Sequence, residues 1–571
     1  MEELTLLAVA AVLIIVAATL FAQKHGIAAP VLLVLIGIGC SFIPGTPEVL
    51  VEPEWILMVV LPPILYSASV NVPITDFRRN LGSITVLSVF LVIGSAVATG
   101  MLLWWLMPEI GLAAAIALGA VVSPPDAVAA VSIGKRLGLP PRLVTVLEGE
   151  GLVNDATALV LLRTAVAAVA GSFSLWQAVG SFAYALVVGI AIGALVGVVS
   201  VGVRSRITQQ PVLTTAISLV VPFVAFMPAE HIGASGVIAV VAAGLITGHQ
   251  SAKKFTAHDR VTERTNWRTI QLLLENGVFL LMGYEITAVV AQVQASGRDI
   301  WTPVGIAVAV TGLLVVVRIA FVVPLIAGLR RKRARALEYA ARITGVPEAV
   351  DAGREQLPAH HRGRGNRQAS VQRRLRMLHS DALALAREGL GWRGGAVLAW
   401  SGMRGVVTLA AAQSLPHHVP HRAELVLIAF TVAVLSLVLQ GGTLPALIRL
   451  LGIRGTDEQR MRQEMSRLAE EIAQARHVFL NSQTLLREDG TPFSAEVLED
   501  IRHRAAQDSA SIAALLELPE DHSPAAQRRE LQAALLEVEQ AVILDARAAG
   551  TYSSHTLEKA QHFIDAHATR P

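Results

Sequence analysis

The sequence predicts an all-α, polytopic membrane protein with about thirteen transmembrane helices, followed by a helical region outside the membrane. Of the 571 residues, 53% are hydrophobic and 16% are charged, whereas a soluble domain carries about 25% charged residues. The mean hydropathy is +0.56. The apolar residues recur in runs of about 20, the length that an α-helix needs to cross a bilayer. This composition excludes a largely disordered chain and argues against a purely soluble enzyme.

Thirteen apolar runs are the candidate membrane spans. They cover residues 4–22, 27–43, 53–72, 83–107, 111–132, 142–170, 176–203, 211–228, 232–248, 270–292, 302–329, 394–415 and 423–449. The first run follows the acidic start Met1-Glu2-Glu3, whereas a secretory signal has a basic start. We therefore expect the first run to be retained as a membrane span.

Lysine and arginine are distributed unevenly between the loops on the two sides of the membrane. With the N-terminus outside, the outer loops hold only Arg298 and Arg422. The inner loops then hold Lys24, Arg78, Arg79, Lys135, Arg136, Arg142, Arg204, Arg206, Lys253, Lys254, Arg260, Arg264 and Arg268. Because cytoplasmic loops carry the excess of basic residues, we expect an outside N-terminus and a cytoplasmic C-terminus. The expected location is a plasma membrane, specifically a bacterial inner membrane. The preference for arginine over lysine is typical of a GC-rich bacterial genome.

Two polar regions stand apart from the expected transmembrane domain, residues 1–452. Residues 330–393 form an arginine-rich stretch, which we interpret as a solvated cytoplasmic loop near anionic lipid. Residues 453–571 are expected to form a helical cytosolic domain. In it, Met461, Met465, Leu468, Ile472, Ala475 and Phe479 recur at helical spacing, as do Leu531, Leu535, Val538 and Val542. The sequence does not indicate whether this domain regulates, dimerises or only folds.

The sixth span carries ionisable groups at the depth of the bilayer. Asp155 lies about halfway along it, and Glu150 and Asn154 share one helix face because they are four residues apart. A charged residue at this depth costs roughly 2.5–3.5 kcal/mol on insertion scales and usually marks an ion pathway. A structural hydrogen-bonding cluster between helices is the alternative, and for Glu150 and Asn154 the two interpretations are evenly balanced.

The fifth and twelfth spans are expected to be broken. Ser123-Pro124-Pro125-Asp126 interrupts the fifth span, because paired prolines remove amide donors and prevent a continuous helix. Asp126 can then cap the half-helix that follows, although a simple proline kink is the alternative. Broken segments in corresponding halves of a membrane protein are typical of inverted-repeat transporters, in which half-helix ends face an ion near the midplane.

Two arginines accompany these features. Arg404 is flanked by glycines at the expected break of the twelfth span, and Arg318 lies near the centre of the eleventh. A buried guanidinium needs a carboxylate partner. Glu150 and Asp155 are the candidates for Arg318 at that depth.

These residues resemble the sodium/proton exchanger branch of the monovalent cation/proton antiporters. The similarity is strongest over Leu147–Val160, where the family pattern reads Glu-Gly-Glu-Ser-Leu-Leu-Asn-Asp. Further matching positions cover most of residues 1–452 in order: Leu61-Pro62-Pro63-Ile64-Leu65, Asp126-Ala127-Val128, Glu275, Phe279, Gly283, Arg318, Met403-Arg404-Gly405 and Gln440-Gly441-Gly442-Thr443. The expected cytosolic domain and the 330–393 loop lie outside the resemblance.

The resemblance implies a thirteen-helix inverted-repeat fold, a homodimer, and exchange of sodium or another monovalent cation for protons. It implies that Asp155 binds cation and proton in turn. It also implies that Asn154, where the electrogenic branch has a second aspartate, makes the exchange electroneutral. Glu150 with Arg318 resembles the buried ion pair that holds the core helices of the family together.

Three positions depart from the family pattern. Gly151 stands where a serine is usual, Ser67 stands where an acidic residue is frequent, and the fifth span reads Pro-Pro-Asp-Ala where Asp-Pro is usual. One side-chain oxygen near the ion is therefore missing. The identity of the transported cation is left open by these changes.

Our hypothesis for the mechanism is competition at one carboxylate. Burial disfavours the charged form of Asp155. A proton or a cation neutralises it, and only the neutral states cross the membrane. We expect the Asn154 and Thr157 side chains and backbone carbonyls of Ser123, Pro124 and Pro125 to replace the water of the cation. We assign Arg404 to bracing the second break. This scheme needs no ATP and no cofactor.

Other classes of function remain as alternatives. A potassium/proton exchanger belongs to the same class with a different ion, and a cation channel without proton coupling could use the same polar groups. A membrane-embedded hydrolase is disfavoured, because no nucleophile, base and orienting group assemble from these motifs. Nucleic-acid binding is also disfavoured, since the positive-inside bias already explains the arginine-rich loop. The expected partners are the cation, the proton, membrane lipid and a second copy of the chain.

Overall fold

A computed structural model of the chain describes residues 2–26, 28–44, 52–169, 175–207, 210–343, 391–405, 407–416 and 419–453. It also describes 472–481, 491–503 and the single residues 466, 470, 531 and 542. The described residues are mainly α-helical, and the expected all-α class is confirmed. The chain divides into two compact units, Met1–Arg454 and Gly455–Pro571.

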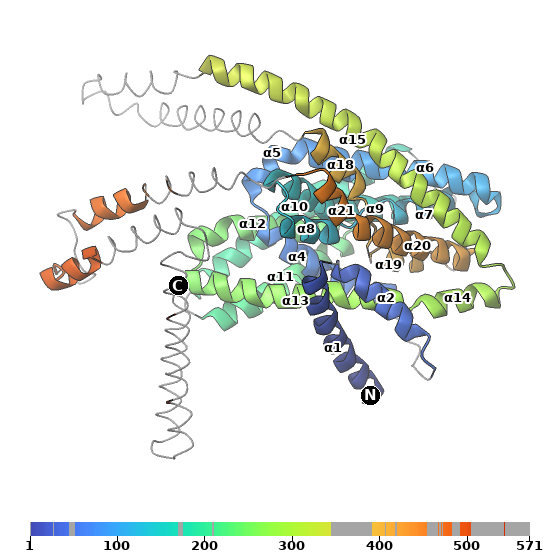
Figure 1. Ribbon diagram of the computed structural model, residues 1–571, viewed down its shortest axis with the longest axis horizontal. Helices are drawn as coiled ribbons and strands as arrows, with labels where there is room; N and C mark the ends of the chain where they lie inside the picture. The colour runs from blue at the N-terminus through green and yellow to red at the C-terminus, as the bar shows by residue number, and fades with distance from the viewer. Residues whose placement is uncertain are drawn as a thin grey trace. The chain divides into compact units, whose positions relative to one another are not determined.

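The first unit contains the membrane-crossing helices, and Figure 1 shows most of them. The first group comprises α1 (Glu2–His25), α2 (Ala29–Ser41), α3 (Pro53–Trp55), η1 (Ile56–Val60), α4 (Leu61–Asn71), α5 (Ile74–Thr85), η2 (Val86–Phe90), α6 (Leu91–Leu106), η3 (Pro108–Ile110), α7 (Gly111–Val122), α8 (Ala127–Arg136) and α9 (Pro141–Val169). The second group comprises α10 (Leu175–Arg204), α11 (Pro211–His231), α12 (Gly236–Lys254), α13 (Ala257–Tyr284), α14 (Ile286–Ala295), α15 (Trp301–Ile343), α18 (Trp392–Trp400), α19 (Val407–Gln413), α20 (Arg422–Ser436), η5 (Leu437–Gly441) and α21 (Gly442–Leu450).

Ten helical segments among the described residues are long and apolar enough to cross a membrane. Two shorter apolar helices, Ala29–Ser41 and Gly236–Ser251, coincide with the expected second and ninth spans. The expected twelfth span is divided into the short helices α18 and α19. The multi-pass class is thus confirmed, and the count of thirteen stays a prediction.

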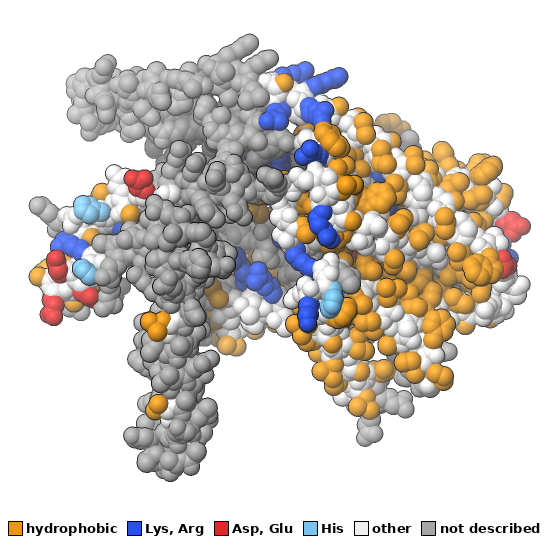
Figure 2. All heavy atoms as spheres, in the orientation of Figure 1, with side chains coloured by type: hydrophobic (Ala, Val, Ile, Leu, Met, Phe, Trp, Pro, Cys, Tyr) orange, Lys and Arg blue, Asp and Glu red, His pale blue; other side chains and the backbone are white. Residues whose placement is uncertain are grey.

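The surface of this unit has the chemistry that a lipid bilayer requires. Figure 2 shows hydrophobic side chains over much of its visible face and lysine and arginine side chains gathered along one edge. Large apolar side chains are exposed along many of the helices, for example Leu13, Val187, Leu195 and Val316. In water such an apolar surface would cause aggregation, whereas in lipid it is the expected outer face.

Two groups of helices form the first unit. In one group, α5, α6, α7 and α8 pack on α9, and α15, α18, α19 and α20 pack among themselves and against α7 and α6. In the other, α10, α11, α12 and α13 pack with one another and with α4, and α2 packs on α13. One main cluster of buried apolar residues lies among α4, α9, α11 and α12, and the larger one joins α6, α7, α9, α15 and α20 to α2, the end of α13 and α14.

Glycine allows the helices α2 and α13 to approach each other closely. A Cβ atom on Gly37 of α2 would overlap the backbone of α13 near Leu280, and one on Gly283 of α13 would overlap the backbone of α2 near Val34. Small residues at such crossings let helix backbones approach closely, which is the main way membrane helices gain packing energy.

The structure extends two expected spans beyond their apolar runs. The eleventh span was expected to end near residue 329, but α15 continues as a helix to Ile343. Its last residues are rich in arginine, alanine and leucine, which favour helix without being apolar. The tenth span begins earlier than expected, at Ala257, behind a capping box between Thr256 and Asp259. The part of the expected 330–393 loop from residue 344 to 390 lies outside the described residues.

The described part of the second unit is helical at 472–480 and 495–503. The backbone N–H of Val497 donates to the Ser494 side chain, an N-terminal cap for the later helix. The expected helix face from Met461 to Phe479 is thus described only in part. Of the later face, Leu531 and Val542 are helical, while Leu535 and Val538 lie outside the described residues.

Candidate functional site

The two expected helix breaks lie against each other. The first separates α7 from α8, and the second separates α18 from α19. At their contact, the backbone N–H of Asp126 donates to the carbonyl of Met403 at 2.6 Å. Irregular backbone is tolerated at membrane depth only where it is buried in protein or lines a cavity. Here the N–H group of Asp126 in the first break and the carbonyl group of Met403 in the second break satisfy each other.

The carboxylate of Asp126 lies where two half-helices begin. One carboxylate oxygen accepts a hydrogen bond from the Val128 N–H at 2.8 Å, which caps α8. The other oxygen lies against Gly405, just before α19, so closely that a Cβ atom there would overlap it. The N-terminal end of a helix carries a partial positive charge. Asp126 therefore places one negative charge beside the starts of both α8 and α19.

Arg404 fastens the second break to its neighbours. Its Nε donates to the carbonyl of Val122 at 2.9 Å, the last residue of α7. Another guanidinium nitrogen donates to the carbonyl of Gly402, and the Arg404 backbone N–H donates to the Ser436 hydroxyl at 2.9 Å. The guanidinium thus compensates the partial negative charge at the C-terminal end of α7. These contacts are those of a bracing residue.

Glu150 and Arg318 form a buried ion pair with two hydrogen bonds. The two terminal nitrogens of Arg318 donate to the two carboxylate oxygens of Glu150 at 2.6 and 2.9 Å. Its Nε donates to the carbonyl of Leu398 at 2.8 Å. Glu150 and Arg318 are only 1% and 2% exposed, so neither charge is compensated by water. The pair ties α9 and α15 to α18, beside the second break.

A cavity of about 560 Å³ opens next to the crossed breaks. Its wall includes Pro124, Pro125 and Asp126 from the first break, Gly405 from the second, and Asp155 from α9. The Asp155 carboxylate makes no hydrogen bond and no ion pair with any described residue, which sets it apart from the Glu150 carboxylate. An unneutralised carboxylate on a cavity wall beside proline carbonyls can bind a small cation or a proton.

Polar side chains of α13 also line this cavity. The Gln271 side-chain amide donates to the Glu275 carboxylate at 2.6 Å, and the Ser67 hydroxyl donates to the Gln271 oxygen at 2.8 Å. Gln271 and Glu275 both line the cavity. The α13 helix therefore adds the carboxylate of Glu275 to those of Asp126 and Asp155.

One end of the cavity lies among charged groups. Lys135, Glu148, Arg264 and Arg268 also line it, and Lys135 pairs with Glu148 at 2.6 Å. Except for Glu148, these residues are among those that the positive-inside rule assigns to the cytoplasmic side. The cavity thus runs from Asp155 toward the side expected to be cytoplasmic.

The expected site residues divide into two sets. Asp155, Pro124 and Pro125, which were expected to bind the ion, line the cavity, and so does Asp126, which was expected to cap the half-helix. Ser123, Asn154 and Thr157 are buried and are not among the lining residues. The hydroxyls of Ser123 and Thr157 donate to the carbonyls of Ala120 and Val153 within their own helices.

Asn154 braces the first break in this structure. Its side-chain nitrogen donates to the Pro125 carbonyl at 2.6 Å, and its side-chain oxygen is buried without a hydrogen-bond partner among the described residues. The direct contact of Asn154 with a cation stays a prediction. Here the Asn154 amide fixes a carbonyl group in the wall beside Asp155.

The glycine at the usual serine position has a packing reason. A Cβ atom on Gly151 would lie 2.5 Å from the Cβ of Ala127, the first residue of α8. The start of α8 therefore packs directly on α9 at this point. The close packing of α8 on α9 therefore leaves no room for the serine side chain that is usual at position 151.

Sequence reasoning missed the contribution of α13 to this site. Glu275 was noted only as a matching position, and Gln271 and Thr408 were not singled out. The available signal was the four-residue spacing of Gln271 and Glu275, which places them on one helix face. Thr408 offered no signal, because its position on the cavity wall depends on the fold.

Comparison with known proteins shows the family of this chain. The family model for the sodium/hydrogen exchanger transmembrane domain matches residues 9–450, and the chain belongs to this family. An uncharacterized Na⁺/H⁺ exchanger of Mycobacterium tuberculosis is 31% identical over 451 residues, which cover 77% of this chain and 73% of that protein. A sodium, potassium, lithium and rubidium/H⁺ antiporter of Bacillus subtilis is 30% identical over 269 residues, 46% of this chain and 40% of that protein.

A solved structure supports the fold. The sodium proton antiporter MjNhaP1 of Methanocaldococcus jannaschii superimposes with a TM-score of 0.52 at 16% identity, covering 79% of this chain and all of that chain. The expected antiporter fold is thereby confirmed for the first unit. The family is one of transporters.

Proposed function

We propose that this protein is a secondary active antiporter that exchanges a monovalent cation, sodium in the first place, for protons. The observation that carries the proposal is the place of Asp155. Its carboxylate has no partner among the described residues and lines a cavity beside two crossed helix breaks. The family membership supports the reaction class, and each relative compared above is named for sodium.

The exchange follows from the electrostatics of one carboxylate. A charged carboxylate at membrane depth is costly, so Asp155 crosses only when a proton or a cation neutralises it. The two ligands then compete for the same oxygen atoms. One cation is exchanged for one proton, and no net charge moves. The ion gradient supplies the energy, so that neither ATP nor a cofactor is required.

The ion pair between Glu150 and Arg318 holds together the helices around Asp155. Because Glu150 is neutralised by two charge-assisted hydrogen bonds, it is not free to bind a cation. Asp126 is partly neutralised by the starts of α8 and α19. Among the acidic residues of α9 near the breaks, Asp155 is thus the one that a transported ion can neutralise.

Alternating access requires a movement of one helix group relative to the other. We propose that α5–α9 and α15–α21 move against a scaffold of α1–α4 and α10–α14 that forms a homodimer. The cavity reaches Lys135 and Arg268, which corresponds to the state open to the cytoplasm. The proposed location is a bacterial plasma membrane, with the N-terminus outside and the C-terminus inside.

The direct test uses purified protein in liposomes that contain a pH-sensitive dye. External sodium, potassium or lithium should each be compared, and we expect sodium to drive a pH change. A valinomycin-imposed potential should not alter the initial rate. The channel alternative would be supported by sodium currents far faster than carrier turnover without any pH change. A pH change driven by potassium alone would show that potassium, and not sodium, is the substrate.

A further inference from the structure

One face of α13 lines the ion cavity from its mouth to its interior. Five residues of α13 lie in the cavity wall at steps of three and four: Arg264, Arg268, Gln271, Glu275 and Phe279. This spacing places them on one side of the helix. The two arginines lie at the mouth, where they repel a cation, and Glu275 follows about two turns after Arg268. A cation that has passed the arginines therefore meets the Glu275 carboxylate.

The Glu275 carboxylate has no basic partner among the described residues. It accepts one hydrogen bond, from the Gln271 side-chain amide at 2.6 Å. The other acidic groups of the wall are held differently, because Glu148 has a lysine partner and Asp126 caps α8. In the described part of the chain, Asp155 and Glu275 are thus the lining carboxylates with neither a basic partner nor a helix start beside them.

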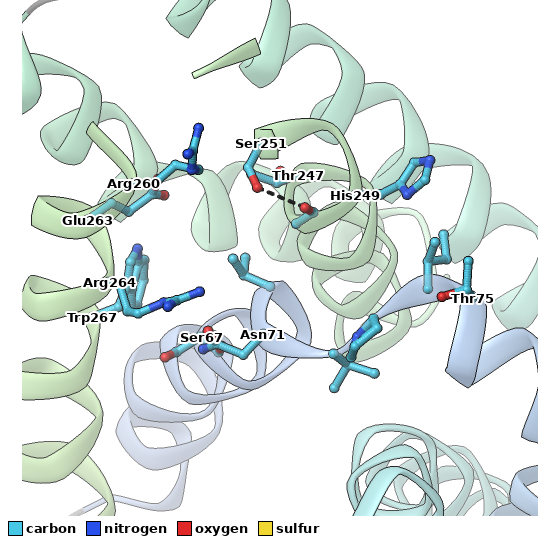
Figure 3. A pocket seen from close by; sticks show the side chains of 15 residues that line it. Ser67, Asn71, Thr75, Thr247, His249, Ser251, Arg260, Glu263, Arg264 and Trp267 are labelled. Atoms are coloured by element: carbon cyan, nitrogen blue, oxygen red, sulfur yellow. Dashed lines mark hydrogen bonds between the residues drawn. The ribbon is translucent and has the colours of Figure 1, made fainter. Parts of the chain in front are cut away.

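Gln271 holds the Glu275 carboxylate in place. The Ser67 hydroxyl of α4 donates to the Gln271 oxygen at 2.8 Å, so that the nitrogen of the same amide points to Glu275. Figure 3 shows Ser67 projecting from α4 toward α13, beside a smaller cavity of about 320 Å³ that both helices line. Ser67 is only 1% exposed, so water does not compete for its hydrogen bond. The chain from Ser67 through Gln271 fixes Glu275 in the wall of the ion cavity.

Glu275 and Asp155 belong to helix groups that are proposed to move against each other. Glu275 lies on α13, which packs with α4 and α11 in the scaffold, whereas Asp155 lies on α9 in the moving group. In the described state both side chains line the same cavity of about 560 Å³. A movement that opens Asp155 to the outside leaves Glu275 behind on the scaffold. The charge of Glu275 therefore acts on Asp155 mainly while the cavity is open to the cytoplasm.

We propose that Glu275 sets the cation affinity of Asp155 on the cytoplasmic side, and that Gln271 positions it for this role. The inference rests on the proposed function, because it concerns the loading of the same cation at the same cavity. Charges about 12 Å apart change a binding constant about tenfold at an effective dielectric constant of about 20. Glu275 attracts a proton to Asp155 as well as sodium, so the equilibrium of the exchange is unchanged.

The first experiment measures sodium-driven exchange at alkaline pH in bacterial membrane vesicles of both orientations. Inside-out vesicles present the cytoplasmic side to added sodium, and right-side-out vesicles present the outer side. Glu275→Gln should raise the apparent KM from the cytoplasmic side about five- to tenfold. The KM from the outer side and the maximal rates should stay unchanged. Glu54→Gln removes an exposed charge of α3 outside the cavity and should change neither KM.

A second set of variants separates the charge of Glu275 from a purely structural role. Gln271→Leu removes the amide that holds the carboxylate and should raise the cytoplasmic KM by a smaller factor. Glu275→Gln combined with Ser67→Asp places the negative charge on the other side of Gln271 and should restore part of the lost affinity. A structural defect would not be rescued by a charge on another helix. Glu275→Asp keeps the charge on α13 and should retain most of the affinity.

Sodium binding without transport is measured as the rise in melting temperature of the purified full chain in sodium chloride relative to choline chloride. Stabilisation of the wild type without any sodium-driven pH change would refute the proposed exchange. A weaker stabilisation of Glu275→Gln would still support its role in binding. The inference is overturned if Glu275→Gln leaves both the cytoplasmic KM and the stabilisation by sodium unchanged. It is equally overturned if this variant raises the KM on both sides by the same factor.

Discussion

The backbone N–H of Asp126 donates to the carbonyl of Met403, and this 2.6 Å contact joins the two interrupted helices of the protein. The Asp126 carboxylate caps α8 and lies against Gly405 at the start of α19. Arg404 in turn holds the end of α7. Contacts between the two breaks therefore hold the crossing together. Asp155 lines the cavity beside it.

The first concerns the contact between Gly405 and Asp126. Gly405→Ala places a methyl group where the Asp126 carboxylate lies. We expect a loss of about 1–3 kcal/mol of stability, as for other overpacked sites, and slower exchange. Gly305→Ala is the matched control, because a Cβ atom there meets nothing within 4 Å. Equal melting temperatures of the two variants in detergent would refute the predicted contact.

The second concerns the glycine that replaces the usual serine. Gly151→Ser should lower the melting temperature, because the new Cβ would overlap Ala127. Adding Ala127→Gly removes the opposing methyl group and should restore part of the loss. The double variant also places a hydroxyl near Asp155, so its cation affinity in flux assays should differ from that of the wild type. No recovery in the double variant would show that another contact sets the cost.

The third concerns the buried ion pair. Arg318→Ala leaves the Glu150 carboxylate buried and unpaired, which costs about 3–5 kcal/mol for such pairs. We expect loss of folded protein in size-exclusion chromatography and a large drop in melting temperature. The double variant Glu150→Gln with Arg318→Met removes both charges and should be more stable than Arg318→Ala. A double variant that is worse than Arg318→Ala would contradict this electrostatic explanation.

The fourth concerns competition at Asp155. Lower pH on the side where the cation binds protonates a larger fraction of the Asp155 carboxylates. The apparent KM for sodium should therefore rise as pH falls, while the maximal rate stays unchanged at saturating sodium. Initial rates in proteoliposomes over a series of sodium concentrations at each pH measure both constants. A constant KM with a falling maximal rate would point to a separate proton site.

Much of the fold could be predicted from the sequence, because apolar run length and helix-breaking residues are local features. The paired prolines at 124 and 125 and the glycines around Arg404 predicted both breaks. The extension of α15 to Ile343 could not be predicted from apolar runs. A basic, alanine-rich helix outside the bilayer has no apolar period to mark it.

The site was less predictable than the fold. Asp155 stood out because an acidic residue in an apolar run is costly, and the same argument identified Glu150 and Arg318. That Asp126 meets Gly405, and that Glu275 and Gln271 share the cavity, depends on how distant helices pack. The spacing gave the helix face of Asn154 and Thr157 but not their present partners, the carbonyls of Pro125 and Val153, and their contact with an ion stays a prediction.

The most direct test of the central claim is sodium-driven pH change in proteoliposomes that contain Asp155→Asn. This substitution keeps the size of the side chain and removes the charge that proton and cation share. We expect a correctly folded protein, with wild-type elution and melting, that moves no protons in response to sodium. Wild-type rates of sodium/proton exchange by this variant would show that Asp155 is not the exchange site.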